Sequence, residues 1–483
     1  MTQTQAGGRN VLAELDQRPP TAFYWRLTLL ACLGGFLFGY DTSNIGSALN
    51  FVPYSLNGFW TGYLVAGASL GAAAGAICAG PIADRFGRKS LLIADALIYA
   101  LGSILAAVTP DVAVLLIART LIGLAIGADS AIATAYIAEY APRGRRGALS
   151  MLQQWMITVG ILIAYIVALV ILKIAPGSAG TVDWRLILGL GAVPALIGLA
   201  LRTQMPESPR WLLRHGDYAG VRKALATFGT DVSQEDVEYT ARQLEQADRR
   251  QERSRNWTRG VRRALFVVCV FFIFQQITGI NIPLYYGPHL LGPLFQGSNS
   301  LVDKTISGVE VTAMLTVVNV AATYFAFRYI DRIGRRKLAI GGYTGMGLFA
   351  ILAAAGLTYF TGTSRIVVVM IGLAAFIASF AVGVGGTGWL LQGEVFPTSV
   401  RGRAASTGAT VDWLANFALV EVFPVWQSGI GLGWVLICFA GLCVLAIGFV
   451  YRFVPETKGR SVEEITEIFD REAAGKTAVQ AAA

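Results

Sequence analysis

Long apolar runs dominate the 483-residue chain and decide what it can fold into. Each run has about twenty residues or more, enough for a helix to cross a hydrocarbon core roughly 30 Å thick. Only 14% of the residues are charged, whereas soluble domains carry about 25%. We therefore predict an all-α membrane protein with twelve transmembrane helices. The predicted spans are residues 24–45, 60–83, 90–108, 112–137, 148–172, 185–203, 264–291, 307–330, 338–359, 365–392, 403–426 and 430–453.

Three short motifs occur twice, in the same order and at nearly the same offset. The pairs are residues 84–89 with 331–336, 139–147 with 394–402, and 206–208 with 455–457. Such agreement indicates an internal duplication of about half the chain, with both copies running in the same direction. It predicts two six-helix bundles in parallel repeat. Transporters of this design bind substrate near the midplane, between halves that rock against each other.

Basic residues gather in the loops that follow the second, fourth, eighth and tenth spans. They are Arg85, Arg88, Lys89, Arg143, Arg145, Arg146, Arg332, Arg335, Arg336, Lys337, Arg401 and Arg403. The alternate loops are poor in Lys and Arg, so the positive-inside rule places the basic loops and both termini in the cytoplasm. The expected location is the plasma membrane, a bacterial inner membrane. Topology also explains the net charge of +9, and no nucleic-acid partner is expected.

The spans divide the chain into four expected parts. Residues 1–203 and 264–454 would form the two bundles, and residues 455–483 a cytoplasmic tail. Residues 204–263 would form a cytoplasmic linker of helices, because this stretch is dense in charges of both signs, as solvated surface helices are.

Catalytic and metal-binding patterns are missing from the sequence. The five cysteines lie within apolar runs and form no Cys-x-x-Cys or Cys/His cluster. No nucleophile–base set or phosphate-binding loop stands out between the spans. We expect neither an enzyme nor a cofactor or metal site; the coupling ion would be a proton.

Several strings resemble a known family. Residues 80–89 resemble the loop signature of the major facilitator superfamily. Residues 206–211, 275–281 and 455–459 resemble the sugar porters within it, which include facilitative glucose transporters and bacterial sugar–proton symporters. The resemblance covers nearly the whole chain and implies the major facilitator fold and transport of a sugar.

A sugar site needs side chains that both donate and accept hydrogen bonds, as amides do. Polar residues inside spans usually face the bundle interior. The seventh span supplies three amides, and the resemblance implies three further contacts. The expected sugar contacts are Gln154, Gln275, Gln276, Asn281, Asn319 and Trp389. The alternative for a single amide, such as Gln153 or Asn416, is a helix–helix contact.

Energy coupling is expected at Asp41 and Arg119, which both lie within apolar sequence. Neither can stay charged and alone inside the membrane without a cost of several kcal/mol, so we expect them to pair. In proton-coupled sugar porters the equivalent aspartate is the proton site. The alternative is a permanent structural ion pair.

Charges of opposite sign recur at the cytoplasmic ends of both bundles. The set is Asp84, Arg88, Glu139, Arg146, Asp331, Arg335, Glu394 and Arg401. Ion pairs among them would hold the inner ends together when the transporter faces outward and would break when it opens inward. The alternative is that they only enforce topology.

Some positions depart from the family pattern. Asp412 precedes Trp413 where the family usually carries Asn or Gln. This carboxylate could bond two sugar hydroxyls, favour a cationic solute or bind a second proton. Asp129 and Asp95 are further intramembrane acids, and Asp95 lies close enough to the inner face to pair with a loop Arg or Lys. Glycines at 383–388 replace the usual proline-rich run, so glycine flexibility would break the tenth span.

The sequence favours a monomeric secondary transporter in the lipid bilayer that imports a monosaccharide with a proton. Three alternatives stay open: a facilitator, a symporter of a polyol, inositol or other small polar metabolite, and a nutrient sensor. Sensors tend to carry long cytoplasmic tails, and the tails here are short.

Overall fold

The computed structural model describes residues 9–12, 14, 22–140, 146–227, 229–253, 257–295, 300–458, 460 and 462–473. Within these ranges, the side chains of Arg146 and Asp331 lie outside the description. The described residues fold as helices and connecting segments, without strands. The prediction of an all-α protein is therefore confirmed.

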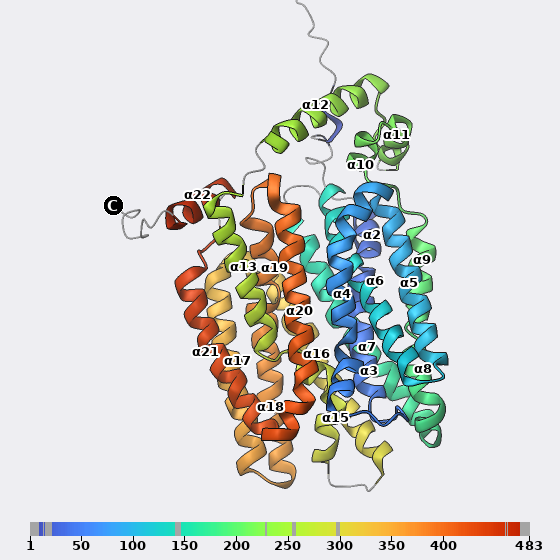
Figure 1. The fold of residues 1–483 in the computed structure, drawn as a ribbon, viewed down its shortest axis with the longest axis vertical. Coiled ribbons are helices and arrows are strands. Elements are labelled where there is room, and N and C mark those ends of the chain that lie inside the picture. Colours follow the sequence, from blue (N-terminus) through green and yellow to red (C-terminus); the bar gives the residue numbers. More distant parts are fainter. Residues whose placement is uncertain are drawn as a thin grey trace, which may run out of the picture.

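The first half of the chain forms one bundle of helices, on the right in Figure 1. Its elements are α2 (Ala22–Ala31), α3 (Leu33–Ala48), α4 (Gly58–Phe86), α5 (Arg88–Val108), α6 (Val112–Tyr140), α7 (Arg146–Ile174), η2 (Pro176–Ser178), η3 (Ala179–Asp183), α8 (Trp184–Gly189) and α9 (Ala192–Arg202).

The second half forms a neighbouring bundle, on the left in Figure 1. Its elements are α13 (Arg259–Ile277), α14 (Asn281–Tyr285), α15 (Gly287–Leu291), η4 (Gly292–Leu294), α16 (Leu301–Ile333), α17 (Arg335–Tyr359), α18 (Gly362–Phe380), η5 (Ala381–Gly385), α19 (Thr387–Glu394), α20 (Thr398–Ile430) and α21 (Leu432–Phe453). The tail adds α22 (Val462–Ala473), which packs on α13.

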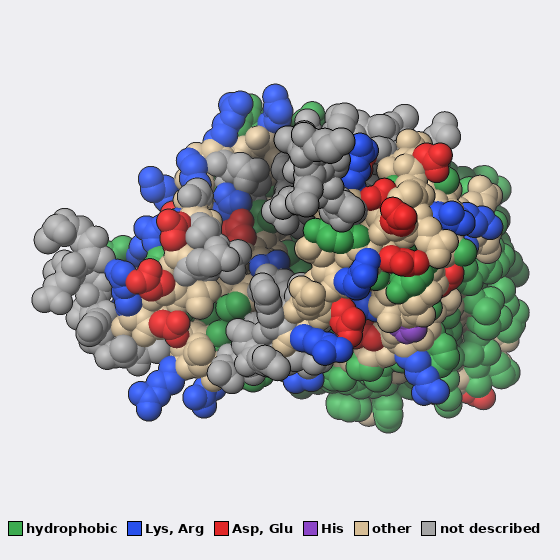
Figure 2. Space-filling model, turned by 90° about the horizontal axis from the view of Figure 1, so that it is seen from above, with side chains coloured by type: hydrophobic (Ala, Val, Ile, Leu, Met, Phe, Trp, Pro, Cys, Tyr) green, Lys and Arg blue, Asp and Glu red, His purple; other side chains and the backbone are tan. Residues whose placement is uncertain are grey.

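Three helices link the bundles and lie beyond their ends: α10 (Pro209–Arg214), α11 (Tyr218–Ala226) and α12 (Gln234–Arg253) (Figure 1). We call this the inner end and the opposite one the outer end. The backbone amide of Arg9 donates to Asp236 on α12 at 2.7 Å. This bond, together with that from the Ser233 hydroxyl, holds the pKa of Asp236 below its ordinary value. Figure 2 views the inner end and shows Lys and Arg side chains spread over it, with hydrophobic side chains on the flank.

Among the described residues, ten helical segments are long and apolar enough to cross a membrane, judged by length and composition. The other two predicted spans correspond to α2–α3 and α20. The first is interrupted at Cys32, so α3 has only 16 residues. The second carries Asp412 and Glu421 within its 33 residues. Both still run the length of a bundle beside their neighbours (Figure 1).

Two spans depart from the regular α-helix near their middle. The seventh breaks between α13 and α14 at Gly279, whose φ is +93° and where a Cβ atom would lie 2.4 Å from the Phe439 ring. The tenth passes through a π-helical turn, η5, made of Ala-Val-Gly-Val-Gly. The glycine-rich stretch thus begins with a change of helix type, and the chain stays helical through it.

Glycines let neighbouring helices approach backbone to backbone. Within the first bundle, a Cβ atom on Gly123 of α6 would lie 1.9 Å from the carbonyl oxygen of Ala68 on α4. Between the bundles, a Cβ atom on Gly62 of α4 would lie 2.2 Å from the carbonyl oxygen of Glu421 on α20. Small residues serve membrane helices in this way because close backbone approach supplies the packing energy.

The bundles also meet at the outer end. Asn50, after α3, donates its amide to the Thr305 hydroxyl on α16 at 3.0 Å. Lys173 of α7 pairs with Glu310 of α16 at 2.5 Å. The outer end of the molecule is therefore closed.

Gly123→Ala should destabilise the first bundle by about 1–3 kcal/mol, because the added methyl group has no room beside Ala68. Gly441→Ala is the matched control, since nothing lies within 4 Å of its Cβ position and alanine is the better helix former by ~1 kcal/mol. Thermal unfolding in detergent should show a lower Tm for the first variant only. Equal Tm values would contradict the close packing of α4 on α6.

Candidate functional site

A chain of hydrogen-bonded side chains lies in the second bundle, on the side that faces the first. Gln276 of α13 donates to Asp412 of α20 at 2.7 Å. Asn281, at the start of α14, donates to Gln276 at 2.7 Å and to Asn416 of α20 at 3.1 Å. We call these four residues the central polar chain. The break at Gly279 makes it possible, because it brings Asn281 back beside Gln276.

Asn416 carries the chain across to the first bundle. Its amide lies 3.2 Å from the Ser69 hydroxyl on α4 and 3.3 Å from the Tyr285 hydroxyl on α14. The sequence offered a helix–helix contact as the alternative for Asn416, and the structure shows contacts with two other helices, α4 and α14. Ser69 was missed, because a lone serine in an apolar run carries no distinguishing signal, and Tyr285 was not among the predicted contacts.

Gln275 points elsewhere than its neighbour Gln276, since successive residues of a helix face directions about 100° apart. It donates to the carbonyl oxygen of Gly385 at 3.0 Å, in the π-helical turn η5. A Cβ atom on Gly388 would lie 2.6 Å from its other amide atom. The glycine-rich stretch thus lets α19 approach α13. Of the two adjacent glutamines, only Gln276 joins the central polar chain.

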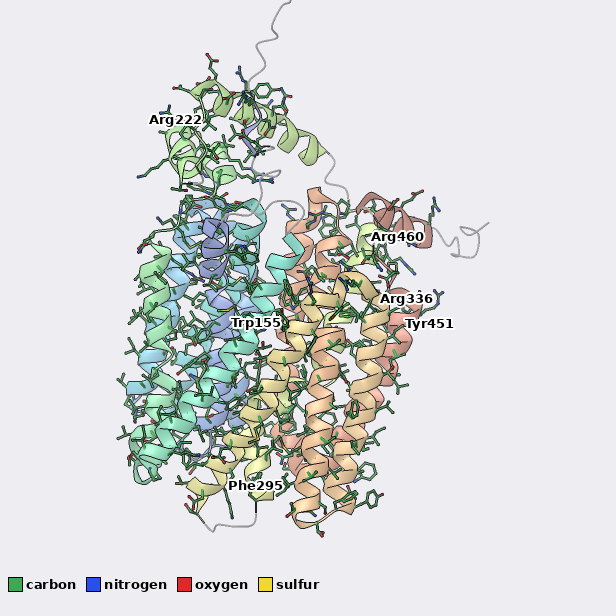
Figure 3. The ribbon with its side chains drawn as sticks, turned by 180° about the vertical axis from the view of Figure 1, so that it is seen from behind. Trp155, Arg222, Phe295, Arg336, Tyr451 and Arg460 are labelled. Carbon is green, nitrogen blue, oxygen red and sulfur yellow. The ribbon has the colours of Figure 1, made fainter. Side chains whose placement is uncertain are left out.

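The remaining predicted contacts lie around this chain. The Trp389 ring is half-buried, 5.0 Å from the Phe272 ring. Asn319 is buried on α16 and accepts from the Thr323 hydroxyl at 3.5 Å. Gln154 is half-buried on α7, next to Trp155, which Figure 3 places between the bundles. Among the described side chains, these three make no hydrogen bond to the central polar chain.

Trp413 follows Asp412 on α20 and packs between the bundles. Its ring lies edge-on to Phe38 of α3, with centroids 4.9 Å apart. The indole is buried, and its Nε1 has no partner among the described residues. Trp413 thus packs against the first bundle, whereas Asp412 forms a hydrogen bond within the second.

Asp41 and Arg119 lie together in the middle of the first bundle, as the sequence led us to expect. Arg119 Nη1 donates to Asp41 Oδ1, and its Nε donates to the carbonyl oxygen of Leu64 at 3.1 Å. The residues are 2% and 1% exposed. Asp41 Oδ2 and Arg119 Nη2 have no partner within the described part of the chain. The pair therefore keeps unused bonding capacity.

A second buried set of charges lies nearer the inner end. Arg202, the last residue of α9, donates to Asp95 on α5 at 2.6 Å and to Asp129 on α6. We call these three residues the Arg202 cluster. The sequence singled out both acids but not Arg202, which lies inside the predicted sixth span, and it offered a loop Arg or Lys as the partner of Asp95. The end of α9 reaches back to the acids instead.

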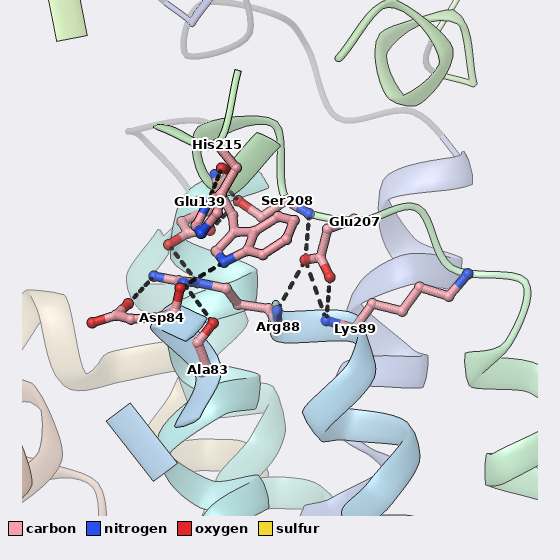
Figure 4. Close-up of polar contacts among 9 residues, drawn as sticks. Ala83, Asp84, Arg88, Lys89, Glu139, Glu207, Ser208 and His215 are labelled. Atoms are coloured by element: carbon pink, nitrogen blue, oxygen red, sulfur yellow. Dashed lines mark hydrogen bonds and ion pairs between the residues drawn. The ribbon is translucent and has the colours of Figure 1, made fainter. Parts of the chain in front are cut away.

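Arg88 organises the inner end of the first bundle (Figure 4). Its guanidinium contacts Asp84 at 2.9 Å, Glu139 at 3.3 Å and the carbonyl oxygen of Ala83 at 3.0 Å. Ser208, from the segment after α9, donates to Glu139 as well. Two of the duplicated motifs thus meet on one arginine.

The third motif, residues 206–208, caps the N-terminus of α5, the helix that begins with Arg88. Glu207 accepts from the backbone amides of Arg88 at 3.0 Å and Lys89 at 3.1 Å, at the N-terminus of α5 (Figure 4). A carboxylate is favourable there because the helix dipole is positive at that end. Gly87 has a φ of +96°, and a Cβ atom on it would lie 2.3 Å from a Glu207 oxygen. Only glycine fits both requirements.

The second bundle repeats this arrangement. Arg335 pairs with Glu394 at 2.8 Å, and Thr457 donates to Glu394 at 2.5 Å. Glu456 accepts from the Arg335 backbone amide at 2.9 Å, behind Gly334 with a φ of +105°. These contacts each lie within one bundle. The sequence identified the three motifs but gave no sign that the third folds onto the first.

Three other residues of the predicted inner network are Arg401, Arg146 and Asp331. Arg401 donates through Nε to the carbonyl oxygen of Phe396 at 3.1 Å. The side chains of Arg146 and Asp331 lie outside the described residues. Figure 3 shows a further contact of the second basic loop, in which Arg336 lies beside Tyr451, 5.1 Å from its ring centre.

Gly87→Ala should lower the Tm more than Gly216→Ala. Both positions have positive φ, so both variants carry backbone strain of about 1–3 kcal/mol. Only the change at Gly87 displaces Glu207 from the α5 N-terminus, at a further cost of ~1 kcal/mol, because the space around Gly216 is open. Equal Tm losses for the two variants would show that the Glu207 contacts add no stability.

Known proteins resemble this chain over nearly its full length. Residues 27–469 match the model of the family described as sugar (and other) transporter. The chain is 34% identical over 471 residues to the arabinose-proton symporter of Bacillus subtilis (strain 168), covering 95% of this chain and 99% of that one. It is 34% identical over 444 residues to the glucose transporter GlcP of Staphylococcus epidermidis, covering 90% and 95%.

The fold is similar to that of the xylose transporter XylE from E. coli in a partially occluded inward open conformation. The TM-score is 0.78 at 28% identity, covering 91% of this chain and 100% of that one. The proton:xylose symporter XylE bound to 6-bromo-6-deoxy-D-glucose gives a TM-score of 0.74 at 29% identity, covering 93% and 99%. The chain therefore belongs to the sugar transporter family of the major facilitator superfamily, a family of transporters rather than enzymes.

Proposed function

We propose that this transporter imports a monosaccharide together with a proton, by alternating access. The observation that carries the proposal is the central polar chain, which lies where the two bundles meet and ends on Ser69 of the first. Its amides can exchange their mutual hydrogen bonds for bonds to sugar hydroxyls. The relatives named as sugar–proton symporters support the same substrate class and coupling ion.

Sugar would enter between the bundles and bind at the central polar chain. Gln276 and Asn281 each offer donors and acceptors. Asp412 offers only acceptors when it is ionised, and it gains one donor when it is protonated. The proposed remaining contacts are Gln154, Gln275, Asn319 and Trp389, which surround the chain. An aromatic face such as that of Trp389 suits the apolar face of a sugar ring. The Asp412 carboxylate has two acceptor oxygens for sugar hydroxyls, whereas an amide at that position would have one.

Proton coupling would run through Asp41. A proton that binds Asp41 from the outside removes its attraction for Arg119, and the guanidinium then turns to its other acceptor, the Leu64 carbonyl oxygen. After the bundles rock, Asp41 loses the proton inside and the pair re-forms. Each charge moved through 100 mV contributes ~2.3 kcal/mol to uphill uptake.

For the orientation in the membrane and the oligomeric state, we propose what the sequence predicts. In this proposal the inner end faces the cytoplasm, with both termini there, and the protein is a monomer in a bacterial plasma membrane. The contacts of Asn50 with Thr305 and of Lys173 with Glu310 close the outer end, as expected of an inward-facing state. The inner lock between the bundles stays a prediction, because the ion pairs of Arg88 and Arg335 described above lie within single bundles.

The direct test is transport in reconstituted vesicles with an imposed pH gradient and a panel of hexoses, pentoses and polyols. Proton uptake that depends on one of the sugars is the expected result. Sugar flux that ignores the gradient would indicate a facilitator instead, and flux of polyols alone would move the substrate to that class.

Asp41→Asn should abolish uphill accumulation of sugar but leave exchange of labelled sugar across the vesicle membrane, because the amide cannot gain or lose the proton. Asp111→Asn serves as the control, since Asp111 is an exposed acid that caps α6 through Val114. Accumulation that survives in the Asp41 variant would remove Asp41 from the coupling mechanism.

Gln276→Leu should raise the half-saturating sugar concentration tenfold or more, because each lost hydrogen bond is worth about 1–3 kcal/mol in a buried site. Gln427→Leu, at the outer end of the same helix that carries Asp412, is the control amide and should leave it unchanged. Equilibrium binding of the preferred sugar measures both. An unaltered affinity in the Gln276 variant would place the sugar elsewhere.

A further inference from the structure

Glu421 differs from the other buried acids of the spans. Asp41, Asp95 and Asp129 contact arginines, and Asp412 accepts from Gln276. Glu421 is only 7% exposed, yet both of its carboxylate oxygens are buried without a partner among the described residues. Burying an ionised carboxylate without a partner would cost far more free energy than the contacts around Glu421 contribute. The carboxyl group must therefore be neutral in this closed outer end.

Glu421 lies on the face of α20 that packs against α4. The Phe417 ring lies 6.2 Å from the Tyr63 ring, and Val425 fills the space beside Gly58. Glu421 stands midway between them at helical spacing, and its own backbone meets Gly62. The acid therefore sits in the contact between the two bundles, in the outer half of the molecule.

The titratable groups around it cannot compensate a charge. Tyr63 of α4 bonds its hydroxyl to Thr120, and Tyr286, after α14, donates to the Val420 carbonyl oxygen. The Lys, Arg, Asp and Glu residues of α4, α13, α19 and α21 are confined to their inner ends.

We propose that Glu421 is a second proton-binding site, one that controls closure of the outer end. Alternating access requires α4 and α20 to part at that end, and Glu421 then meets outside water and ionises. When the bundles close again, a proton passes from outside water to the carboxylate, and the neutral group is buried. On reopening, the proton returns to the outside water. The site thus acts on the gate and carries no proton across the membrane.

The sign of the pH dependence follows from linkage. The closed outer end binds one more proton than the open one, so raising the outside pH favours the open end and lowering it favours the closed end. For one proton, the open-to-closed ratio changes by up to about tenfold per pH unit. The proposal rests on the proposed function only for alternating access, because it needs no coupling at Asp41.

The experiment measures the distance across the outer end in lipid nanodiscs, without sugar, between pH 5 and 8 as an experimental range of about three units. Spin labels go on Gly177→Cys in the first bundle and Gly429→Cys in the second, two positions with open space around them. The exposed native Cys78 is replaced by Ser. The labelled parent should show an open population that grows with pH by up to about tenfold per unit.

Glu421→Gln should lose this pH dependence and stay closed, and Glu421→Met should do the same if the amide variant folds poorly. Asp111→Asn should keep the dependence of the parent. A parent without pH dependence, or a Glu421→Gln protein that retains it, overturns the proposal. Asp41→Asn separates the two ideas: it should keep the pH-dependent distance while losing uphill accumulation.

Discussion

Charges inside the hydrocarbon region must find their partners within the protein, and the architecture of this transporter depends on that requirement. Asp41 with Arg119 ties α3 to α6, and the Arg202 cluster ties α9 to α5 and α6. Both sets lie in the first bundle. Because removing one member of a buried pair leaves an uncompensated charge, each contact fixes the relative position of its helices strongly. The first bundle is thus cross-linked electrostatically at two depths.

The second bundle solves a different problem with different chemistry. Its central polar chain consists of amides and one acid, Asp412, joined by hydrogen bonds, and two of its spans are interrupted at glycines. Hydrogen bonds between neutral groups exchange partners at little net cost. The first bundle therefore relies on charge pairs, one of which we propose to open and re-form during transport, while the second offers hydrogen bonds that a sugar can replace. The two halves of the duplication thus share a helical arrangement but differ in their buried polar side chains.

Much of this could be predicted from the sequence. Apolar runs located the spans, and the repeated motifs indicated paired bundles and the family, which the comparisons confirm. The Asp41–Arg119 contact followed from the cost of an isolated charge. The contacts that were not predicted depend on which way a side chain points and on which distant parts of the chain come together. Sequence cannot show that Gln275 and Gln276 face different helices, that Arg202 bends back to two acids, or that Ser69 lies across from Asn416. Glu421 was missed although it lies in the predicted span 403–426, where an acid is as unusual as Asp95 or Asp129, and its lack of a partner is visible only in three dimensions.

The glutamates that follow the last helix of each bundle change what counts as a half of this molecule. Glu207 and Glu456 lie beyond the membrane in sequence, but they bind the first turn of the third helix of their own bundle. Each bundle is therefore completed by the residues that leave it. A half-transporter produced by ending the chain at the membrane boundary would expose the amides at the start of α5 or α17. A separable half must extend through Ser208 or Thr457, so that it carries its own closing residues.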